Sequence, residues 1–292
     1  MIRMRKYLKD SNVPVIDSHT HILPKDVKDN IHKYLDIDST FNTLFSNSES
    51  ISTAEELIDS MDTLKIDTSI ILGMGWNDNK FNEYINDYII ESGKKYPERF
   101  IPITGIIPNG DNEAIYEAER CVTLGAKGFG EIHADAQNIN IIDKKKFSPY
   151  VEILQSKNLP IILHSSEPVG HKYPGKGSST PNKIERFVYN FPELKIILSH
   201  WGGGMFLYEL MPEISSSFKN VYYDSATSPF LYDQKIFQIA IETVTSAKIL
   251  FGSDFPIISQ SRLLQELHNV IINDKDKQNI IYQNAKSLFL TN

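Results

Sequence analysis

The stretch Val13-Pro14-Val15-Ile16-Asp17-Ser18-His19-Thr20-His21 contains an apolar run that is followed at once by two histidines. On an extended strand successive side chains point to opposite faces, so His19 and His21 point to the same face. Two imidazoles side by side at the end of a strand can bind one metal ion. A pair of this kind on its own is more often a surface or hydrogen-bonded pair, so other parts of the chain have to supply further ligands.

Short apolar runs alternate with amphipathic segments along the whole sequence. Runs with the length and composition of buried strands lie at residues 13–19, 68–74, 100–106, 126–131, 160–164, 195–200, 221–224 and 248–251. Helical periodicity lies between them, at residues 53–64, 79–94, 112–124, 145–156, 181–190, 205–216, 234–245 and 261–272, with a last helix at 277–290. This alternation predicts an α/β fold, a distorted (β/α)8 TIM barrel, with a doubly wound open sheet as the alternative.

Local signals support this organisation. Thr53 and Glu56 have the spacing of a capping box, and Gly125 stands where a predicted helix should end. The polar residues 24–49 are too many for a tight turn, so they predict an inserted loop with short helices after the first strand. No linker, low-complexity segment or repeat interrupts the pattern, which predicts one domain over residues 1–292.

Composition excludes several classes of function. The chain has 292 residues, of which 41% are hydrophobic and 23% are charged, and its formal net charge is -7. No cluster of Lys and Arg is strong enough to bind a duplex, so extended nucleic acid is not an expected partner. No apolar run could span a bilayer, and no apolar core of a secretion signal follows the basic residues 1–6. The single Cys121 rules out an internal disulfide and fits a reducing compartment, so we expect a cytoplasmic protein.

Residues that can bind metal stand at the ends of five predicted strands. Barrel enzymes place their active sites at the C-terminal ends of strands, so these side chains should converge. Each one alone has a structural explanation, such as a hydrogen-bonded histidine or a helix-capping carboxylate, but together they indicate a metal site with a position open for water. The predicted ligands are His19, His21, Glu131, His164, His200 and Asp254.

The motifs that carry most of these residues are Asp17-Ser18-His19-Thr20-His21, Leu163-His164, Leu198-Ser199-His200-Trp201-Gly202-Gly203 and Phe251-Gly252-Ser253-Asp254-Phe255-Pro256. In their order and spacing the chain resembles the amidohydrolase superfamily, specifically the amidohydrolase-related branch that includes aminocarboxymuconate-semialdehyde decarboxylase. The resemblance covers nearly the whole chain. It implies a catalytic divalent metal, usually zinc, and gives His200 the role of a second-metal ligand or a free acid/base group. The ligands that it implies for the first metal are His19, His21, His164 and Asp254.

Glu131 discriminates between the reactions that this resemblance allows. The decarboxylases of the branch do not normally present a metal-bridging carboxylate on strand four, whereas TatD-like nucleases carry Gly-Glu there and other binuclear hydrolases use a carboxylated lysine. Lys127 lies about 13 Å from Glu131 along an extended strand, so we favour Glu131 as the bridge between two metals. We also predict a buried pair between Lys127 and Asp17. His133 is interpreted as a loop histidine.

These residues predict a metal-dependent hydrolase that cleaves an amide, a lactone or another ester in a small anionic molecule. A divalent metal would activate water, Asp254 would take the proton, and His200 would help to polarise the scissile bond. The first alternative is a mononuclear decarboxylase on the same fold, in which His200 and water handle the proton. A non-catalytic barrel scaffold and a TatD-like nuclease are further alternatives. Zinc is the expected metal, as one or two ions, with manganese or iron as alternatives.

Loops at the same face of the barrel should contact the substrate. The loop at residues 167–177 follows strand five, and its His171, Lys172 and Lys176 would contact an anionic group. Trp76 follows strand two and is a predicted wall of the pocket, although an aromatic residue in such a place often packs only with the protein. The resemblance adds that relatives are often homodimers. The sequence does not reveal the substrate.

Overall fold

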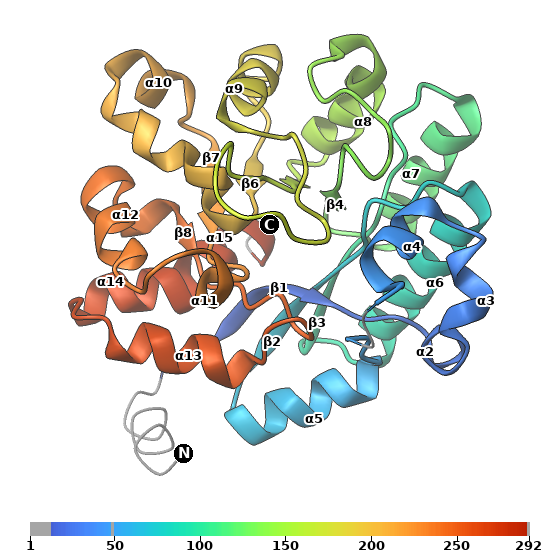
Figure 1. Ribbon diagram of the computed structural model, residues 1–292, viewed down its shortest axis with the longest axis horizontal. Helices are drawn as coiled ribbons and strands as arrows, with labels where there is room; N and C mark the ends of the chain where they lie inside the picture. Colours follow the sequence, from blue (N-terminus) through green and yellow to red (C-terminus); the bar gives the residue numbers. More distant parts are fainter. Residues whose placement is uncertain (1–12, 48–49, 291–292) are drawn as a thin grey trace.

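The structure is a computed structural model that describes residues 13–47 and 50–290. Parallel strands stand at its centre and helices surround them (Figure 1). The strands of the described residues are β1 (Ile16–His21), β2 (Thr68–Leu72), β3 (Phe100–Ile103), β4 (Phe129–Ile132), β5 (Ile161–Leu163), β6 (Ile196–Leu198), β7 (Val221–Asp224) and β8 (Ile249–Leu250). The basic residues 1–6 and residues 48–49 of the predicted insertion lie outside the described residues.

The strands form two parallel sheets that meet at both edges. One sheet has the order β1-β2-β3, and the other has the order β4-β5-β6-β7-β8. Backbone bridges join Thr104, after β3, to Phe129 of β4, and Thr20 of β1 to Phe255, after β8. The order of strands therefore returns to β1, which confirms the predicted (β/α)8 barrel and excludes the open sheet.

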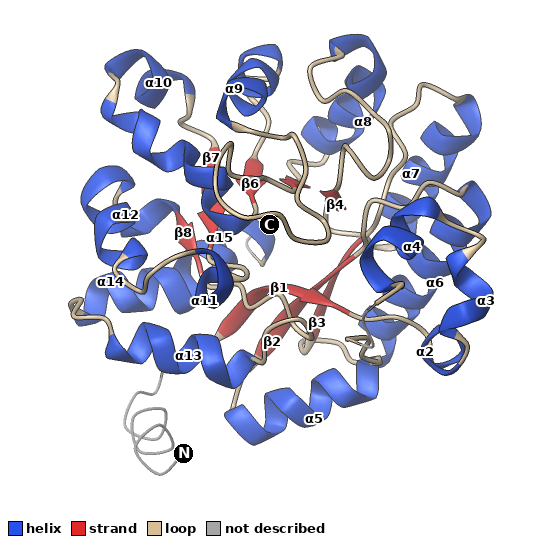
Figure 2. Ribbon diagram, in the orientation of Figure 1, coloured by secondary structure: helices blue, strands red, loops and turns tan. Residues whose placement is uncertain are grey.

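Helices cover the outside of the strands (Figure 2). The main ones are α5 (Ala54–Leu64), α6 (Asn79–Lys95), α7 (Asn112–Leu124), α8 (Lys144–Ser156), α9 (Pro181–Asn190), α10 (Pro212–Ser217), α12 (Ile236–Val244) and α13 (Gln260–Asn269). The predicted capping box is present, because Thr53 accepts a hydrogen bond from the backbone of Glu56 while the Glu56 carboxylate accepts one from the backbone of Thr53. Gly125 ends α7 with a φ of 116°. No helix of the described residues is both long and apolar enough to cross a membrane.

Short helices follow β1, as the polar composition of residues 24–49 predicts. They are α2 (Lys25–Asp29), α3 (Ile31–Leu35) and α4 (Ser39–Phe45). The buried ring of Phe41 lies 6.1 Å from the ring of Trp76 and 5.7 Å from that of Phe81, measured between centroids. This aromatic cluster attaches α4 to the barrel beside the ends of the strands.

The helix predicted at residues 205–216 differs from the structure. A 3₁₀ helix, η1 (His200–Leu210), comes directly after β6, and α10 begins separately at Pro212. The two are separated by Met211, which is extended (φ -84°, ψ 120°) before Pro212. The start of η1 is itself a left-handed turn, in which the φ of Trp201 is 60° and that of Gly203 is 58°. A Cβ atom at Gly203 would lie 2.3 Å from the carbonyl oxygen of Ser166, so only glycine fits there.

The predicted C-terminal helix is present and is interrupted by a π-helical turn. Its parts are α14 (Asp274–Gln278), η3 (Asn279–Gln283) and α15 (Asn284–Phe289). The backbone N–H of Phe251 donates to the carbonyl of Ile280 (2.9 Å), and the Asn284 amide donates to the carbonyl of Ile249 (2.7 Å). These bonds attach the C-terminal helix to β8, which is shorter than the strand predicted at residues 248–251.

Candidate metal centre and its cavity

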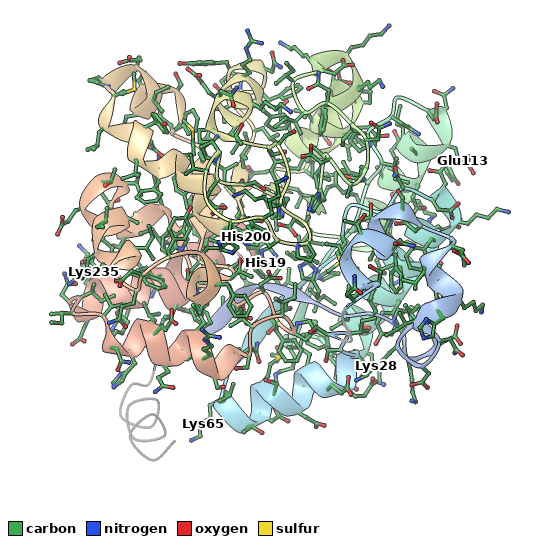
Figure 3. The ribbon with its side chains drawn as sticks, viewed as in Figure 1. His19, Lys28, Lys65, Glu113, His200 and Lys235 are labelled. Carbon is green, nitrogen blue, oxygen red and sulfur yellow. The ribbon has the colours of Figure 1, made fainter. Side chains whose placement is uncertain are left out.

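The structure brings the six predicted metal ligands together at the C-terminal ends of the strands. All of them are buried, and Figure 3 shows His19 and His200 close to each other near the centre of the molecule. They form two groups, and within each group the ligand atoms lie within 4.8 Å of one another. The first group is His19, His21 and Asp254, and the second group is Glu131, His164 and His200.

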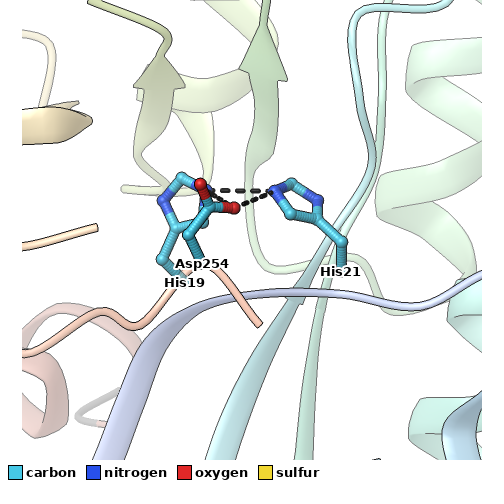
Figure 4. A group of neighbouring side chains, drawn as sticks. All are labelled: His19, His21 and Asp254. Atoms are coloured by element: carbon cyan, nitrogen blue, oxygen red, sulfur yellow. Dashed lines mark hydrogen bonds and ion pairs between the residues drawn. The ribbon is translucent and has the colours of Figure 1, made fainter. Parts of the chain in front are cut away.

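The first group presents two imidazole nitrogens and one carboxylate oxygen to a common point (Figure 4). The Nε2 atoms of His19 and His21 lie 3.1 Å apart. Asp254 Oδ1 lies 3.4 Å from Nε2 of His21 and 3.7 Å from Nε2 of His19. Nitrogen and oxygen donors at these separations fit a divalent cation, because each can turn a lone pair toward the same ion.

The second group lies around one carboxylate. Glu131 Oε1 lies 3.1 Å from Nδ1 of His164 and 3.3 Å from Nε2 of His200. The other oxygen, Oε2, lies 3.7 Å from Nε2 of His19 and 3.8 Å from Nε2 of His21. Glu131 therefore lies between the two groups and turns one oxygen toward each.

Hydrogen bonds behind the ligands fix which ring nitrogen faces the centre. Nδ1 of His19 lies 2.9 Å from Asp224 Oδ2, which turns Nε2 of the ring toward the first group. The hydroxyl of Thr227 lies 2.7 Å from Nδ1 of His200, which directs Nε2 of that ring toward Glu131. Asp224 also accepts a hydrogen bond from the backbone N–H of His200 (3.0 Å).

Asp224 is the residue of the centre that sequence reasoning missed. It is the last residue of β7 and is fully buried. The predicted strand at residues 221–224 also ends on Asp224, so the sequence already placed this residue at the same edge of the barrel as the six predicted ligands. Its orienting contact with His19 was not predictable, because the two residues are 205 positions apart in the chain.

Two glycines let ligand-bearing segments approach their neighbours. A Cβ atom at Gly130, where φ is 147°, would lie 2.7 Å from Cβ of Ile162 in β5. A Cβ atom at Gly252 would lie 2.8 Å from Cβ of His19. Side chains at these two positions would push apart the backbone on which Glu131 and Asp254 stand.

Charge inside the centre favours an ionised carboxylate beside protonated imidazoles. Burial raises the pKa of Glu131, but the neighbouring charges of His19 and His164 outweigh burial and hold that pKa well below its usual value. Burial lowers the pKa of His200, but the hydrogen bond and charge of Glu131 raise it to about 9. The centre therefore combines an ionised carboxylate with strongly basic imidazoles, and a cation would bind there by displacing protons.

The predicted pair between Lys127 and Asp17 is wrong. Lys127 is exposed, whereas Asp17 is buried and accepts hydrogen bonds from the Ser253 hydroxyl (2.6 Å) and the Gln260 amide (2.8 Å). The prediction counted alternate positions back from Glu131, but β4 begins only at Phe129, so strand alternation does not extend to Lys127.

A cavity of about 440 Å³ opens above the two groups. Its floor includes ligands of both groups, and most of its walls are apolar. The apolar wall residues come from α4, from the segments after β2 and β8, and from α11 (Ser228–Leu231). These residues are Leu44, Phe45, Met74, Phe230, Leu231 and Ile257.

The loop between β5 and α9 crosses the centre of the view and supplies the remaining wall (Figure 1). Of the four predicted substrate contacts, His171 in this loop lines the cavity. Lys172 is exposed, and the Lys176 ammonium donates to the carbonyls of Val169 (2.5 Å) and His171 (3.1 Å). Trp76 is fully buried in the aromatic cluster with Phe41. The lining of the cavity contains none of these last three residues.

His133 has a larger part in the structure than that of a loop histidine. Its buried ring stacks on His164 with 4.1 Å between centroids, and its Nε2 donates to the carbonyl of Gly175 (2.7 Å). Burial lowers the pKa of His133 to about 3, so the ring is neutral. His133 thus connects the crossing loop to the second group.

Comparisons with known proteins agree with this fold. A family model described as amidohydrolase matches residues 16–290. The gamma-resorcylate decarboxylase of Polaromonas sp. (strain JS666) is 25% identical over 248 residues, which cover 71% of this chain and 75% of that protein. The crystal structure of 5-carboxyvanillate decarboxylase from Sphingomonas paucimobilis has a TM-score of 0.77 at 16% identity, over 96% of this chain and 100% of that chain.

A further solved structure contains ligands. It is a dihydroxybenzoic acid decarboxylase from Polaromonas sp. JS666 with bound manganese and the inhibitor 2-nitroresorcinol. It matches with a TM-score of 0.69 at 20% identity, over 95% of this chain and 97% of that chain. These similar proteins are decarboxylases, which overturns the prediction of an amide, lactone or ester hydrolase and favours the alternative. Zinc stays a prediction, because the metal in this similar structure is manganese.

Proposed function

Since the chain belongs to the amidohydrolase family, we propose that it is a metal-dependent decarboxylase that removes a carboxylate from a small aromatic acid. The observation that carries this proposal is a set of buried imidazole and carboxylate ligands at the floor of a mainly apolar cavity. An aromatic ring suits the apolar walls, and its carboxylate suits a cation at the floor. The decarboxylases of similar sequence and fold support this choice of reaction.

The first group, His19, His21 and Asp254, would hold the divalent cation. A cation bound there supplies a Lewis acid that neutralises and orients the substrate carboxylate. Imidazole and carboxylate donors accept both zinc and manganese, and the manganese of the similar dihydroxybenzoic acid decarboxylase favours testing manganese first.

His200 is the residue that we assign to proton transfer. Decarboxylation breaks the bond between the ring and the carboxylate, releases carbon dioxide and leaves the electron pair on the ring carbon, which then takes a proton. Nε2 of His200 lies at the floor of the cavity, beside the carboxylate of Glu131, which raises the pKa of this imidazole against the opposing effect of burial. Glu131, 3.3 Å from this nitrogen, stabilises the protonated form and holds it in place.

The direct test is release of carbon dioxide from aromatic acids by protein purified without chelator. A panel of hydroxybenzoates, including 2,6-dihydroxybenzoate and 5-carboxyvanillate, is the first choice of substrates. We expect release from at least one of them, loss of that release after chelation, and its return with Mn²⁺ or Zn²⁺. Release that survives complete removal of metal would contradict the metal requirement. Cleavage of a lactone or an amide without any decarboxylation would contradict the reaction.

The number of bound ions tests the assignment of His200. With one cation in the first group, elemental analysis should give one equivalent of metal per chain, unchanged in Glu131→Gln. His200→Gln should then lose decarboxylation while retaining the metal. Two equivalents that fall to one in Glu131→Gln would make His200 a ligand of a second ion, and its role as proton donor would be excluded.

A further inference from the structure

A fully buried carboxylate stands two residues before His19 and is not one of the six ligands. It belongs to Asp17, the second residue of β1, and it accepts hydrogen bonds at both oxygens. Oδ1 accepts from the backbone N–H of Ser253 (2.8 Å) and from that of His19 (3.3 Å). Oδ2 accepts from the Ser253 hydroxyl (2.6 Å) and from the side-chain amide of Gln260 (2.8 Å). Asp17 therefore joins β1 to the segment after β8 and to α13.

Ser253 bonds to Asp17 through both its backbone and its side chain. Its hydroxyl donates to Asp17 and accepts a hydrogen bond from the backbone N–H of Phe255 (3.0 Å). Between these two residues, the backbone N–H of Asp254 donates to the carbonyl of His19 (2.8 Å). The residues on either side of Asp254 are thus bonded to each other, and one of them is bonded twice to a single buried carboxylate.

The backbone of Asp254 needs such support because its conformation is left-handed, with a φ of 67°. Residues other than glycine adopt this conformation at a cost, and it persists where the surrounding contacts determine it. In this conformation Oδ1 of Asp254 lies 3.4 Å from Nε2 of His21 and 3.7 Å from Nε2 of His19. The position of the carboxylate in the first group therefore depends on how the segment around Asp254 is held.

We propose that Asp17 is a positioning residue for the cation of the first group. By holding Ser253, it holds Asp254 in the left-handed conformation from which the Asp254 carboxylate meets the two imidazoles. The inference rests on the proposed function for the presence of a cation in the first group. Gln260 supports this arrangement, because its Oε1 accepts from the Ser60 hydroxyl (2.7 Å), which turns the N–H groups of its amide toward Asp17.

The hydrogen-bonded arrangement can be tested without any metal. Amide hydrogen exchange over residues 253–255 of the metal-free full chain should be about 10-fold faster in Asp17→Asn than in the wild type. The reason is that an Asn side chain accepts at one oxygen only and places donor N–H groups where Ser253 or Gln260 already supplies a donor. Exchange as slow as in the wild type would overturn the proposal.

A pair of variants separates position from charge. Asp17→Asn removes the charge of the carboxylate, whereas Ser253→Ala keeps that charge and removes the hydroxyl that connects Asp17 to Phe255. Titration calorimetry should show Mn²⁺ binding that is about 10-fold weaker or more in both variants, although every ligand is intact. Weaker binding in Asp17→Asn alone would show that Asp17 acts through its charge, and would contradict the positioning role.

The matched control is Tyr150→Phe, which removes another hydroxyl from a fully buried side chain. This hydroxyl donates to the carbonyl of Ile107 (2.9 Å). Tyr150→Phe should lower the thermal stability of the chain but leave the Mn²⁺ affinity and the exchange of residues 253–255 unchanged. If it weakened Mn²⁺ binding as much as Ser253→Ala does, general loss of stability would explain the effect, and the proposal would be wrong.

The two proposals fail separately in this design. A wild-type chain that binds no Mn²⁺ would contradict the cation of the proposed function, while the exchange comparison would still decide whether Asp17 holds the segment around Asp254. Mn²⁺ binding by the wild type with unchanged affinity in both Asp17→Asn and Ser253→Ala would contradict the positioning role and leave the proposed function intact.

Discussion

The floor and the walls of the cavity are built in opposite ways. The floor consists of charged and imidazole side chains at the ends of strands, and hydrogen bonds such as that from His19 to Asp224 hold them in place. The walls consist mainly of apolar side chains from α4, α11 and the loop that crosses the barrel mouth. The difference indicates that the barrel determines the chemistry, whereas the connecting segments determine which molecule reaches it.

The largest expected effect belongs to a floor residue that we propose as a ligand of the cation. His19→Asn should lower kcat/KM by about 1,000-fold or more and abolish stoichiometric metal binding, because the cation contributes several kcal/mol to stabilising charge in the reaction. Elemental analysis and the assay of carbon dioxide release measure the two effects. The matched control is His32→Asn, which changes an exposed histidine of α3 and should retain both. Full metal content in His19→Asn would remove His19 from the ligand set.

A smaller effect is expected where a residue acts on the floor through another side chain. Asp224→Asn keeps a polar group beside Nδ1 of His19 but loses the charge that directs the ring, so metal affinity and kcat/KM should fall about 10- to 100-fold. Titration with Mn²⁺ measures the affinity. Asp59→Asn, at an exposed site on α5, is the control. An Asp224→Asn protein with unaltered metal affinity would limit Asp224 to a structural role.

Wall residues should influence binding more than chemistry. Phe230 lines the cavity and is 53% exposed, so Phe230→Ala removes apolar contact with the substrate ring. We expect KM to rise about 3- to 10-fold, because the lost contact is worth about 1 kcal/mol, and kcat to change by less than about twofold. Tyr116→Ala, on the outer surface of α7, should change neither. A fall in kcat larger than the rise in KM would show that Phe230 acts in the chemical step. The assignment of chemistry to the floor and of substrate binding to the walls would then be wrong.

The floor was predictable from the sequence because two local signals coincide there. An apolar run indicates a strand, and a ligand-type residue such as Glu131 or Asp254 at its end indicates the active edge of a barrel. The partner of a floor residue was harder to predict. Asp224 ends a strand in the same way, but nothing local says that its carboxylate faces His19. The predicted partner of Asp17 was wrong because strand alternation does not extend back from Glu131 to Lys127.

The walls were predicted less well, because loop conformation depends on contacts with distant segments. The charge of Lys176 and its position after β5 predicted a contact with the substrate. In the structure its ammonium instead donates hydrogen bonds to backbone carbonyls of its own loop. Trp76 was expected at the pocket wall, but Phe41 of the inserted helix α4 covers it. Each outcome depends on a contact that the sequence does not encode as a local pattern.

The smallest expected effect tests that account of the walls. Lys176→Met retains much of the length of the side chain and removes the ammonium, which already binds Val169 and His171 and does not line the cavity. KM for a hydroxybenzoate should therefore change by less than about twofold, as it should in the exposed Lys172→Met. A rise in KM of tenfold or more in Lys176→Met alone would mean that the crossing loop supplies positive charge to the substrate. The walls would then share the electrostatic role that the structure otherwise confines to the floor.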